Sequence, residues 1–185
     1  VHSIETDFGG GYGGMMLGVT VIDPESRILQ SAMMTIEGLV VFNAESTLEQ
    51  LTIERAVPPF DSNAFARGVM EDIRLMFFPP SGPATVGKTE AGRPICRYEA
   101  GPDRMLDIHF DPETGWVYQL YRAGKLVRTV RADAKQAVVS PPGEVIPRRM
   151  TLTGHGSPEY TLHLKLLEAK PLKDAPSLEQ DMISP

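Results

Sequence analysis

Residues 116–131 read WVYQLYRAGKLVRTVR, which is two runs of alternating residues separated by the dipeptide Ala123-Gly124. A two-residue loop between such runs is typical of a β-hairpin, because its turn matches the twist of two antiparallel strands. This loop length predicts four cross-strand pairs on one face: Arg122 with Lys125, Leu120 with Val127, Tyr118 with Thr129, and Trp116 with Arg131. The stretch therefore predicts an antiparallel sheet in this part of the chain.

The segments on either side of this hairpin alternate in the same way. Leu106, Ile108 and Phe110 share one face of a predicted strand, and residues 111–115 after it have the composition of a tight turn. Further strands are predicted at residues 15–22, 28–37, 48–55, 148–154 and 160–167. Residues 81–94 are rich in glycine, proline and small polar residues, so they predict a loop. Most of the chain is therefore expected to form antiparallel strands.

One segment has a helical period instead. Its apolar residues recur at i, i+4, i+8 and i+11, which are Phe65, Val69, Ile73 and Met76. A polar residue at position 61, 62 or 63 can cap the start of this helix, and Pro79-Pro80 ends it because proline has no N–H to donate. The sequence predicts one principal helix with an apolar stripe.

Length and composition indicate one folded domain. The chain has 185 residues, of which 42% are hydrophobic and 23% are charged. We expect a single domain over residues 15–172, a flexible glycine-rich lead over residues 1–14, and a polar tail over residues 173–185. The formal net charge of -6 argues against a nucleic-acid partner, since binding to a duplex depends on neutralising phosphates.

Residues that could carry chemistry are scattered. Asp107 and His109 supply two possible metal ligands on one strand, whereas a zinc site needs three or four. The lone Cys96 cannot form an internal disulfide, and no serine lies in a GxSxG motif. We therefore predict no catalytic residues, no metal site and no cofactor. A cluster of His109, His155 or His163 with a carboxylate and a nucleophile would reverse that expectation.

The order of elements ends in two alternating segments, IPRRMTL at residues 146–152 and YTLHLKL at residues 160–166. This order, together with the helix end EDIRLMFFP at residues 71–79, resembles the lipoprotein-localisation proteins LolA and LolB. Within that superfamily the pattern is most similar to LolB-like bacterial outer-membrane lipoproteins of unknown function. The resemblance covers residues 15–172 in element order.

The resemblance implies a mainly β (α+β) fold, an antiparallel open (half) barrel wrapped around one principal helix, with an apolar cavity for acyl chains. It also implies a periplasmic protein, anchored to the outer membrane through a lipidated N-terminal segment ahead of Val1. Within such a fold, the partners are an acyl chain or lipid-like ligand, with a membrane surface or an acylated protein as a further partner.

The predicted cavity has a helix wall and a sheet wall. Phe65, Val69, Ile73 and Met76 are expected to form the helix wall. The predicted sheet wall consists of Trp116, Tyr118, Leu120 and Met34, with the opposite face at Val117 and Tyr121 as the alternative. The nine methionines are compatible with such a cavity, because methionine adapts to irregular apolar shapes, and ordinary core packing is the alternative interpretation.

Basic residues outnumber acidic ones between Trp116 and Met150, although the whole chain is acidic. This asymmetry predicts that Arg122, Arg128 and Arg131 contact an anionic head group or membrane surface. A solvated surface without a partner is the alternative interpretation.

Together these features predict a non-enzymatic periplasmic carrier or chaperone that binds an acylated or apolar ligand. Two alternatives remain at this point. One is an accessory envelope-assembly lipoprotein whose core is filled by its own side chains. The other is a small acyl hydrolase.

Overall fold

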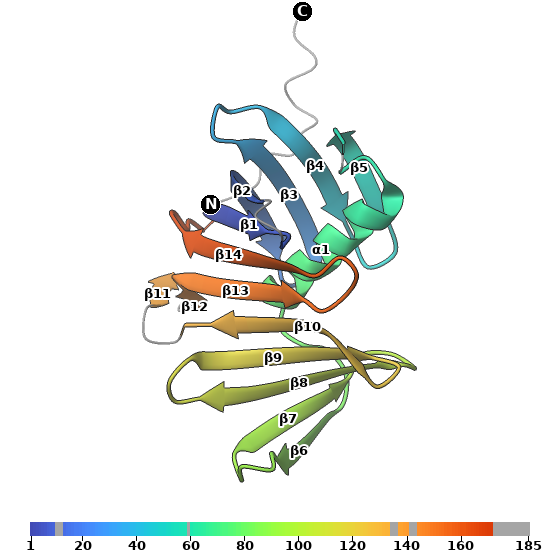
Figure 1. Ribbon diagram of the computed structural model, residues 1–185, viewed down its shortest axis with the longest axis vertical. Helices are drawn as coiled ribbons and strands as arrows, with labels where there is room; N and C mark the ends of the chain where they lie inside the picture. Colours follow the sequence, from blue (N-terminus) through green and yellow to red (C-terminus); the bar gives the residue numbers. More distant parts are fainter. Residues whose placement is uncertain (10–12, 59, 134–136, 141–143, 172–185) are drawn as a thin grey trace, which may run out of the picture.

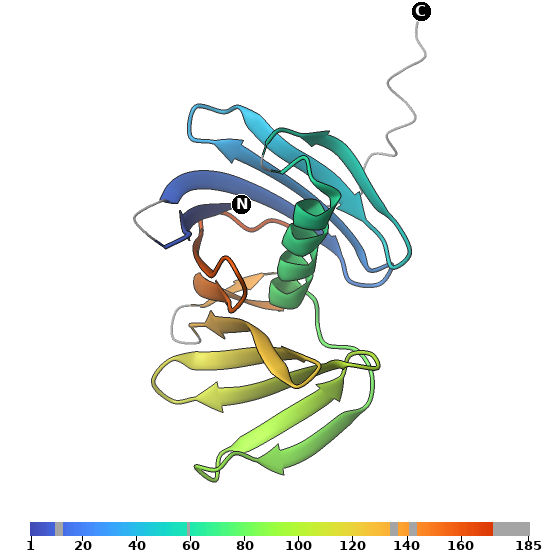
Figure 2. The ribbon, with the colours of Figure 1, turned by 45° about the vertical axis from the view of Figure 1, so that its right-hand side comes forward.

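The computed structural model describes residues 1–9, 13–58, 60–133, 137–140 and 144–171 (Figures 1 and 2). These residues form one helix, α1 (Asn63–Phe77), and a series of β-strands. The strands are β1 (His2–Asp7), β2 (Gly13–Asp23), β3 (Ile28–Thr35), β4 (Val40–Ser46), β5 (Leu51–Ala56), β6 (Ala84–Lys88), β7 (Pro94–Glu99), β8 (Arg104–Asp111), β9 (Gly115–Arg122), β10 (Lys125–Ala132), β11 (Ala137–Ser140), β12 (Glu144–Pro147), β13 (Arg149–Gly154) and β14 (Tyr160–Leu166).

Twelve of these strands form one antiparallel sheet in the order β5-β4-β3-β2-β1-β14-β13-β10-β9-β8-β7-β6, and β11 pairs only with β12. The described edge strands β5 and β6 lie at opposite ends of this order, so the sheet is not closed (Figure 1). Helix α1 connects the two edges along the chain and lies against one face of the sheet (Figure 2). The prediction of a mainly β, antiparallel fold with one principal helix is confirmed for the described residues.

The start of the chain differs from its prediction. β1 lies in the middle of the sheet, where Ile4 faces Leu164 of β14 on one side and Met16 of β2 on the other. The flexible lead predicted over residues 1–14 is therefore wrong for His2–Asp7, which is a strand paired on both sides. His2 and Thr6 are buried on one face of this strand. Because the strand is short and glycines follow it, its alternating pattern was not recognised in the sequence. The predicted tail, residues 173–185, lies outside the described residues.

Helix α1 begins and ends where its sequence predicts. The Ser62 hydroxyl accepts a hydrogen bond from the Phe65 N–H at 3.1 Å, which satisfies one of the free donors of the first turn. At the other end, the N–H of Phe78 donates to the carbonyl of Arg74 at 3.0 Å, and the chain then leaves the helix at Pro79-Pro80. The side chains of Ala66, Met70 and Ile73 are buried against the sheet.

The β9–β10 hairpin has the predicted turn but a different register. Ala123 and Gly124 both have positive φ, 47° and 75°, as a two-residue turn of this kind requires. Arg122 pairs with Lys125 as predicted, whereas Leu120 pairs with Arg128 rather than with Val127. A β-bulge between Leu126 and Arg128 inserts one extra residue and shifts every later pair. The bulge therefore places Arg128 on the same face as Leu120.

The main core lies between α1 and strands β3 and β4. Leu29 and Phe42 are completely buried there, and Met70 packs beside them from the helix. A smaller buried cluster of Ala132, Met150 and Leu164 extends under the end of the helix, where Met76 and Phe77 contact it. Residues 81–94, predicted as a loop, instead contain the exposed edge strand β6, which pairs with β7.

Candidate functional site: a cavity between helix and sheet

A cavity of about 670 Å³ lies between α1 and the central strands. One wall comes from α1, the other from β1, β2, β3 and β14, and the loop between β13 and β14 contributes further residues. Most lining side chains are apolar. Volumes of about 300–1,000 Å³ with mainly apolar walls are characteristic of sites for small organic ligands.

The helix wall contains each of the helix residues predicted for it, namely Phe65, Val69, Ile73 and Met76. The helix, however, has two adjacent apolar surfaces rather than one stripe. The core-facing side of α1 is formed by Ala66, Met70 and Ile73, so the cavity lies along the neighbouring side of the helix. Ile73 belongs to both surfaces.

The sheet wall is different from the predicted one. Trp116, Tyr118, Leu120 and Met34 do not line the cavity. Met33 lines it in place of Met34, because Leu29, Ser31 and Met33 are the buried residues of β3 and successive side chains point to opposite faces. Trp116 is 45% exposed and lies on β9, four strands from β1 in the sheet order, where its ring contacts Phe110.

Two of the glycines in the cavity wall have open space beside them. Gly68 lies on the helix wall, and, apart from its chain neighbours and the backbone of its own helix, a Cβ atom added there would meet no heavy atom within 4 Å among the described residues. A Cβ at Gly14 on β2 would meet only the Thr6 hydroxyl, at 3.9 Å. The space beside Gly68 is therefore open, and a side chain introduced there would extend into the cavity.

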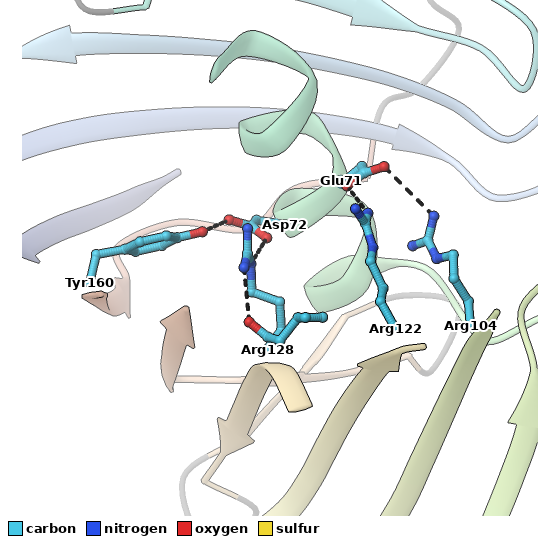
Figure 3. Close-up of polar contacts among 7 residues, drawn as sticks. Glu71, Asp72, Arg104, Arg122, Arg128 and Tyr160 are labelled. Atoms are coloured by element: carbon cyan, nitrogen blue, oxygen red, sulfur yellow. Dashed lines mark hydrogen bonds and ion pairs between the residues drawn. The ribbon is translucent and has the colours of Figure 1, made fainter. Parts of the chain in front are cut away.

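A buried polar cluster forms one part of the wall (Figure 3). Asp72, on the helix, is 6% exposed. Its Oδ1 accepts a hydrogen bond of 2.7 Å from Nε of Arg128 on β10, and its Oδ2 accepts a hydrogen bond from the Tyr160 hydroxyl on β14. Nη1 of Arg128 donates to the carbonyl of Val127 at 2.8 Å, and the guanidinium lies 5.2 Å from the centre of the Tyr160 ring.

Burial governs the protonation of this cluster. Loss of solvent raises the pKa of Asp72 above its ordinary value, while the charge of Arg128 and the two hydrogen bonds offset part of that effect. Burial also raises the pKa of Tyr160, and the adjacent Asp72 carboxylate adds to the rise. Tyr160 is therefore a neutral hydrogen-bond donor to a carboxylate at neutral pH.

A second carboxylate–arginine contact lies outside the cavity. Glu71, next to Asp72 on the helix, accepts a hydrogen bond of 2.6 Å from Arg122 and lies 3.6 Å from Arg104 (Figure 3). These three side chains are 38% to 46% exposed, in contrast to the 8% of Asp72. Water weakens such pairs, so Glu71 serves as a natural comparison for Asp72.

The three arginines predicted to contact an anionic surface do not form one surface. Arg122 and Arg128 are paired with the helix carboxylates. Arg131 follows Arg128 by three residues, so it lies on the opposite face of β10, beside Glu113 and Asp133. Strand alternation alone separates Arg128 from Arg131, and the bulge determines that Arg128 is the one that shares the face of Leu120.

Arg74, in the last turn of α1, makes further hydrogen bonds to the chain around the sheet. Its Nη2 donates to the carbonyls of Ser46 at 2.7 Å and Thr47 at 2.8 Å, and both terminal nitrogens lie 3.2 Å from the carbonyl of Arg27. Ser46 is the last residue of β4 and Thr47 follows it, while Arg27 lies in the turn between β2 and β3. The C-terminal part of the helix is therefore held by polar contacts of both Asp72 and Arg74.

His2 is a buried neutral base beside the cavity. Its side chain is among the lining residues, its ring centre is 5.2 Å from that of Phe77, and its Nε2 has no hydrogen-bond partner among the described residues. Burial lowers the pKa of His2 from 6.5 to about 4, and the positive charge of the Val1 ammonium adds to the effect. The imidazole is therefore uncharged at neutral pH.

This buried histidine predicts a specific loss of stability in mild acid. Because the folded-state pKa is below the unfolded-state value, the unfolded chain binds the proton first, and stability falls as pH drops from about 6.5 toward 4. Between pH 7 and pH 5 we expect His2 to cost about 2 kcal/mol of unfolding free energy. Urea titrations at both pH values measure this difference. A His2→Phe variant with the same pH dependence as the parent would contradict the assignment.

Two of the other described histidines each contact a threonine hydroxyl. His155 Nε2 lies 2.8 Å from the Thr129 hydroxyl, and its Nδ1 lies 3.9 Å from a carboxylate oxygen of Glu159. Thr129 is only 3% exposed, so a substrate cannot reach its hydroxyl in this arrangement. His163 contacts Thr151 instead, and the described residues contain no group of three or more side chains suited to holding a metal ion.

Comparison with known proteins identified no family. No family model matches the chain, and no curated protein matches it significantly. Among the described residues, no helix combines the length and apolar character needed to cross a membrane.

Proposed function

We propose that this protein is a non-enzymatic carrier or chaperone that binds an acylated or otherwise apolar ligand in the cavity between α1 and the sheet. The observation that supports it is the cavity itself, about 670 Å³ in volume with mainly apolar walls. An unfilled apolar space of this size costs stability, because its lining atoms lose packing contacts. A ligand that fills it regains those contacts. The cavity also favours a carrier over an accessory protein with a self-filled core.

The proposal also includes a more specific fold, an open half-barrel. The unclosed sheet, with its helix against one face, is suited to act as an open half-barrel wrapped around α1, in the manner of LolA and LolB. A periplasmic location, anchoring at the outer membrane through a lipidated N-terminus, and delivery to a membrane surface or acylated protein follow from that likeness.

The proposal predicts that affinity depends on the length of the ligand's alkyl chain. Each methylene transferred from water into an apolar site contributes about 0.8 kcal/mol, so the dissociation constant should fall about fourfold per methylene. The fall should end once the chain fills the cavity. The experiment displaces the neutral fluorescent probe N-phenyl-1-naphthylamine from the full chain with straight-chain alcohols from hexanol to dodecanol.

Saturable probe binding and a steep dependence on chain length support the carrier. Absence of saturable probe binding, together with no displacement by any alcohol, would contradict it. Lysozyme at the same concentration serves as the control for partition of the probe onto ordinary protein surface.

A further inference from the structure

The chemistry of the cavity wall restricts the head group of a ligand. Among the described residues that line it, only Asp72 and Arg128 carry a formal charge at neutral pH. They are of opposite sign and are paired with each other at 2.7 Å. The lining therefore has no net charge, although it contains an arginine that would otherwise attract an anion.

The charges of this pair compensate each other within the protein. Both carboxylate oxygens of Asp72 accept hydrogen bonds, from Arg128 and from Tyr160. Arg128 in turn donates through Nε to Asp72 and through Nη1 to the Val127 carbonyl, while its guanidinium stacks on Tyr160. An anion entering the cavity would have to compete with a buried carboxylate that is already in place.

Uncharged hydrogen-bonding groups are also present in the wall. The side chains of Thr20 and Ser31 lie directly opposite each other on β2 and β3, and both line the cavity. Ser31 is 2% exposed, so its hydroxyl is sheltered from bulk solvent. Such hydroxyls can donate to or accept from an alcohol, an ester or an amide.

We infer that the cavity selects apolar ligands with an uncharged, hydrogen-bonding head group over fatty-acid anions and alkylammonium cations of equal chain length. A charge brought into this space would be desolvated without an available counter-ion, which is costly, whereas a hydroxyl, ester or amide is desolvated at lower cost and finds partners. The inference rests on the proposed carrier function and specifies the chemical class of its ligand.

Three ligands with the same twelve-carbon chain test this inference. Dodecanol, dodecanoate and dodecylammonium are each titrated, below the concentrations at which they form micelles, against the full chain loaded with N-phenyl-1-naphthylamine at pH 8. We expect dodecanol to bind at least about tenfold more tightly than either ion. Dodecanoate or dodecylammonium binding as tightly as dodecanol would overturn the inference and leave the carrier function intact. Failure of all three to displace the probe would count against the carrier itself.

An Asp72→Asn variant tests the cause of the selectivity. Without the carboxylate, Arg128 has no counter-ion in the wall, so the ratio of dodecanoate affinity to dodecanol affinity should rise at least about tenfold. The ratio within one variant is insensitive to a general loss of stability. The matched control is Glu71→Gln, which removes the adjacent carboxylate outside the cavity and should leave the ratio unchanged. An unchanged ratio in Asp72→Asn, or an equal rise in both variants, would refute the role assigned to the pair.

Discussion

Replacement of Arg128 with alanine should lower the free energy of unfolding by about 3 kcal/mol at pH 8, because it leaves a buried carboxylate without its cation. Asp72 is 6% exposed and would keep only the hydrogen bond from Tyr160. The penalty should become smaller as pH falls. Without Arg128, the folded-state pKa of Asp72 lies further above its unfolded value, so protonation in acid favours the folded state.

Urea denaturation at pH 8 measures this effect, with Arg122→Ala as the matched control. Arg122 makes the equivalent contact with Glu71, but both side chains are more than 40% exposed, so its loss should cost less than about 1 kcal/mol. In an Asp72→Asn background, Arg128→Ala should cost much less than in the parent. Equal costs of the two arginine substitutions would show that the buried pair does not stabilise the fold.

The sequence was informative where local chemistry decides the structure. The Ser62 cap, the proline pair after the helix and the Ala123-Gly124 turn all lie where they were predicted, because each depends on neighbouring residues alone. The helix wall of the cavity was predictable for the same reason. Helical periodicity places Phe65, Val69 and Met76 on one side without any knowledge of the sheet.

The sheet wall and the polar cluster could not be predicted, because they depend on long-range pairing. One bulge in β10 brings Arg128 to the face of Leu120, and only then can it reach Asp72, which is 56 residues away in the chain. Likewise, β1 forms the centre of the sheet by pairing with β14 at the far end of the domain. An acidic residue beside the apolar stripe of a helix, such as Asp72, was the available indication of a buried polar partner.

A large loss of ligand affinity is expected when a bulky side chain replaces Gly68, where the wall of the cavity has open space. In Gly68→Phe, the phenyl ring would occupy the volume that a ligand needs, without displacing another residue at Cβ. Probe affinity should fall at least about tenfold, equivalent to about 1.4 kcal/mol. Gly68→Ala is the matched control: it should raise stability by up to about 1 kcal/mol, because alanine is the better helix former, and it should keep most of the binding.

Titration of N-phenyl-1-naphthylamine into these two variants and the parent, alongside their thermal unfolding, tests the carrier most directly. We predict saturable binding by the parent and by Gly68→Ala, and loss of binding by a Gly68→Phe protein whose unfolding temperature is at least that of the parent. Equal probe affinity in the parent and in a folded Gly68→Phe variant would contradict the account, because it would show that the ligand binds elsewhere than in this cavity.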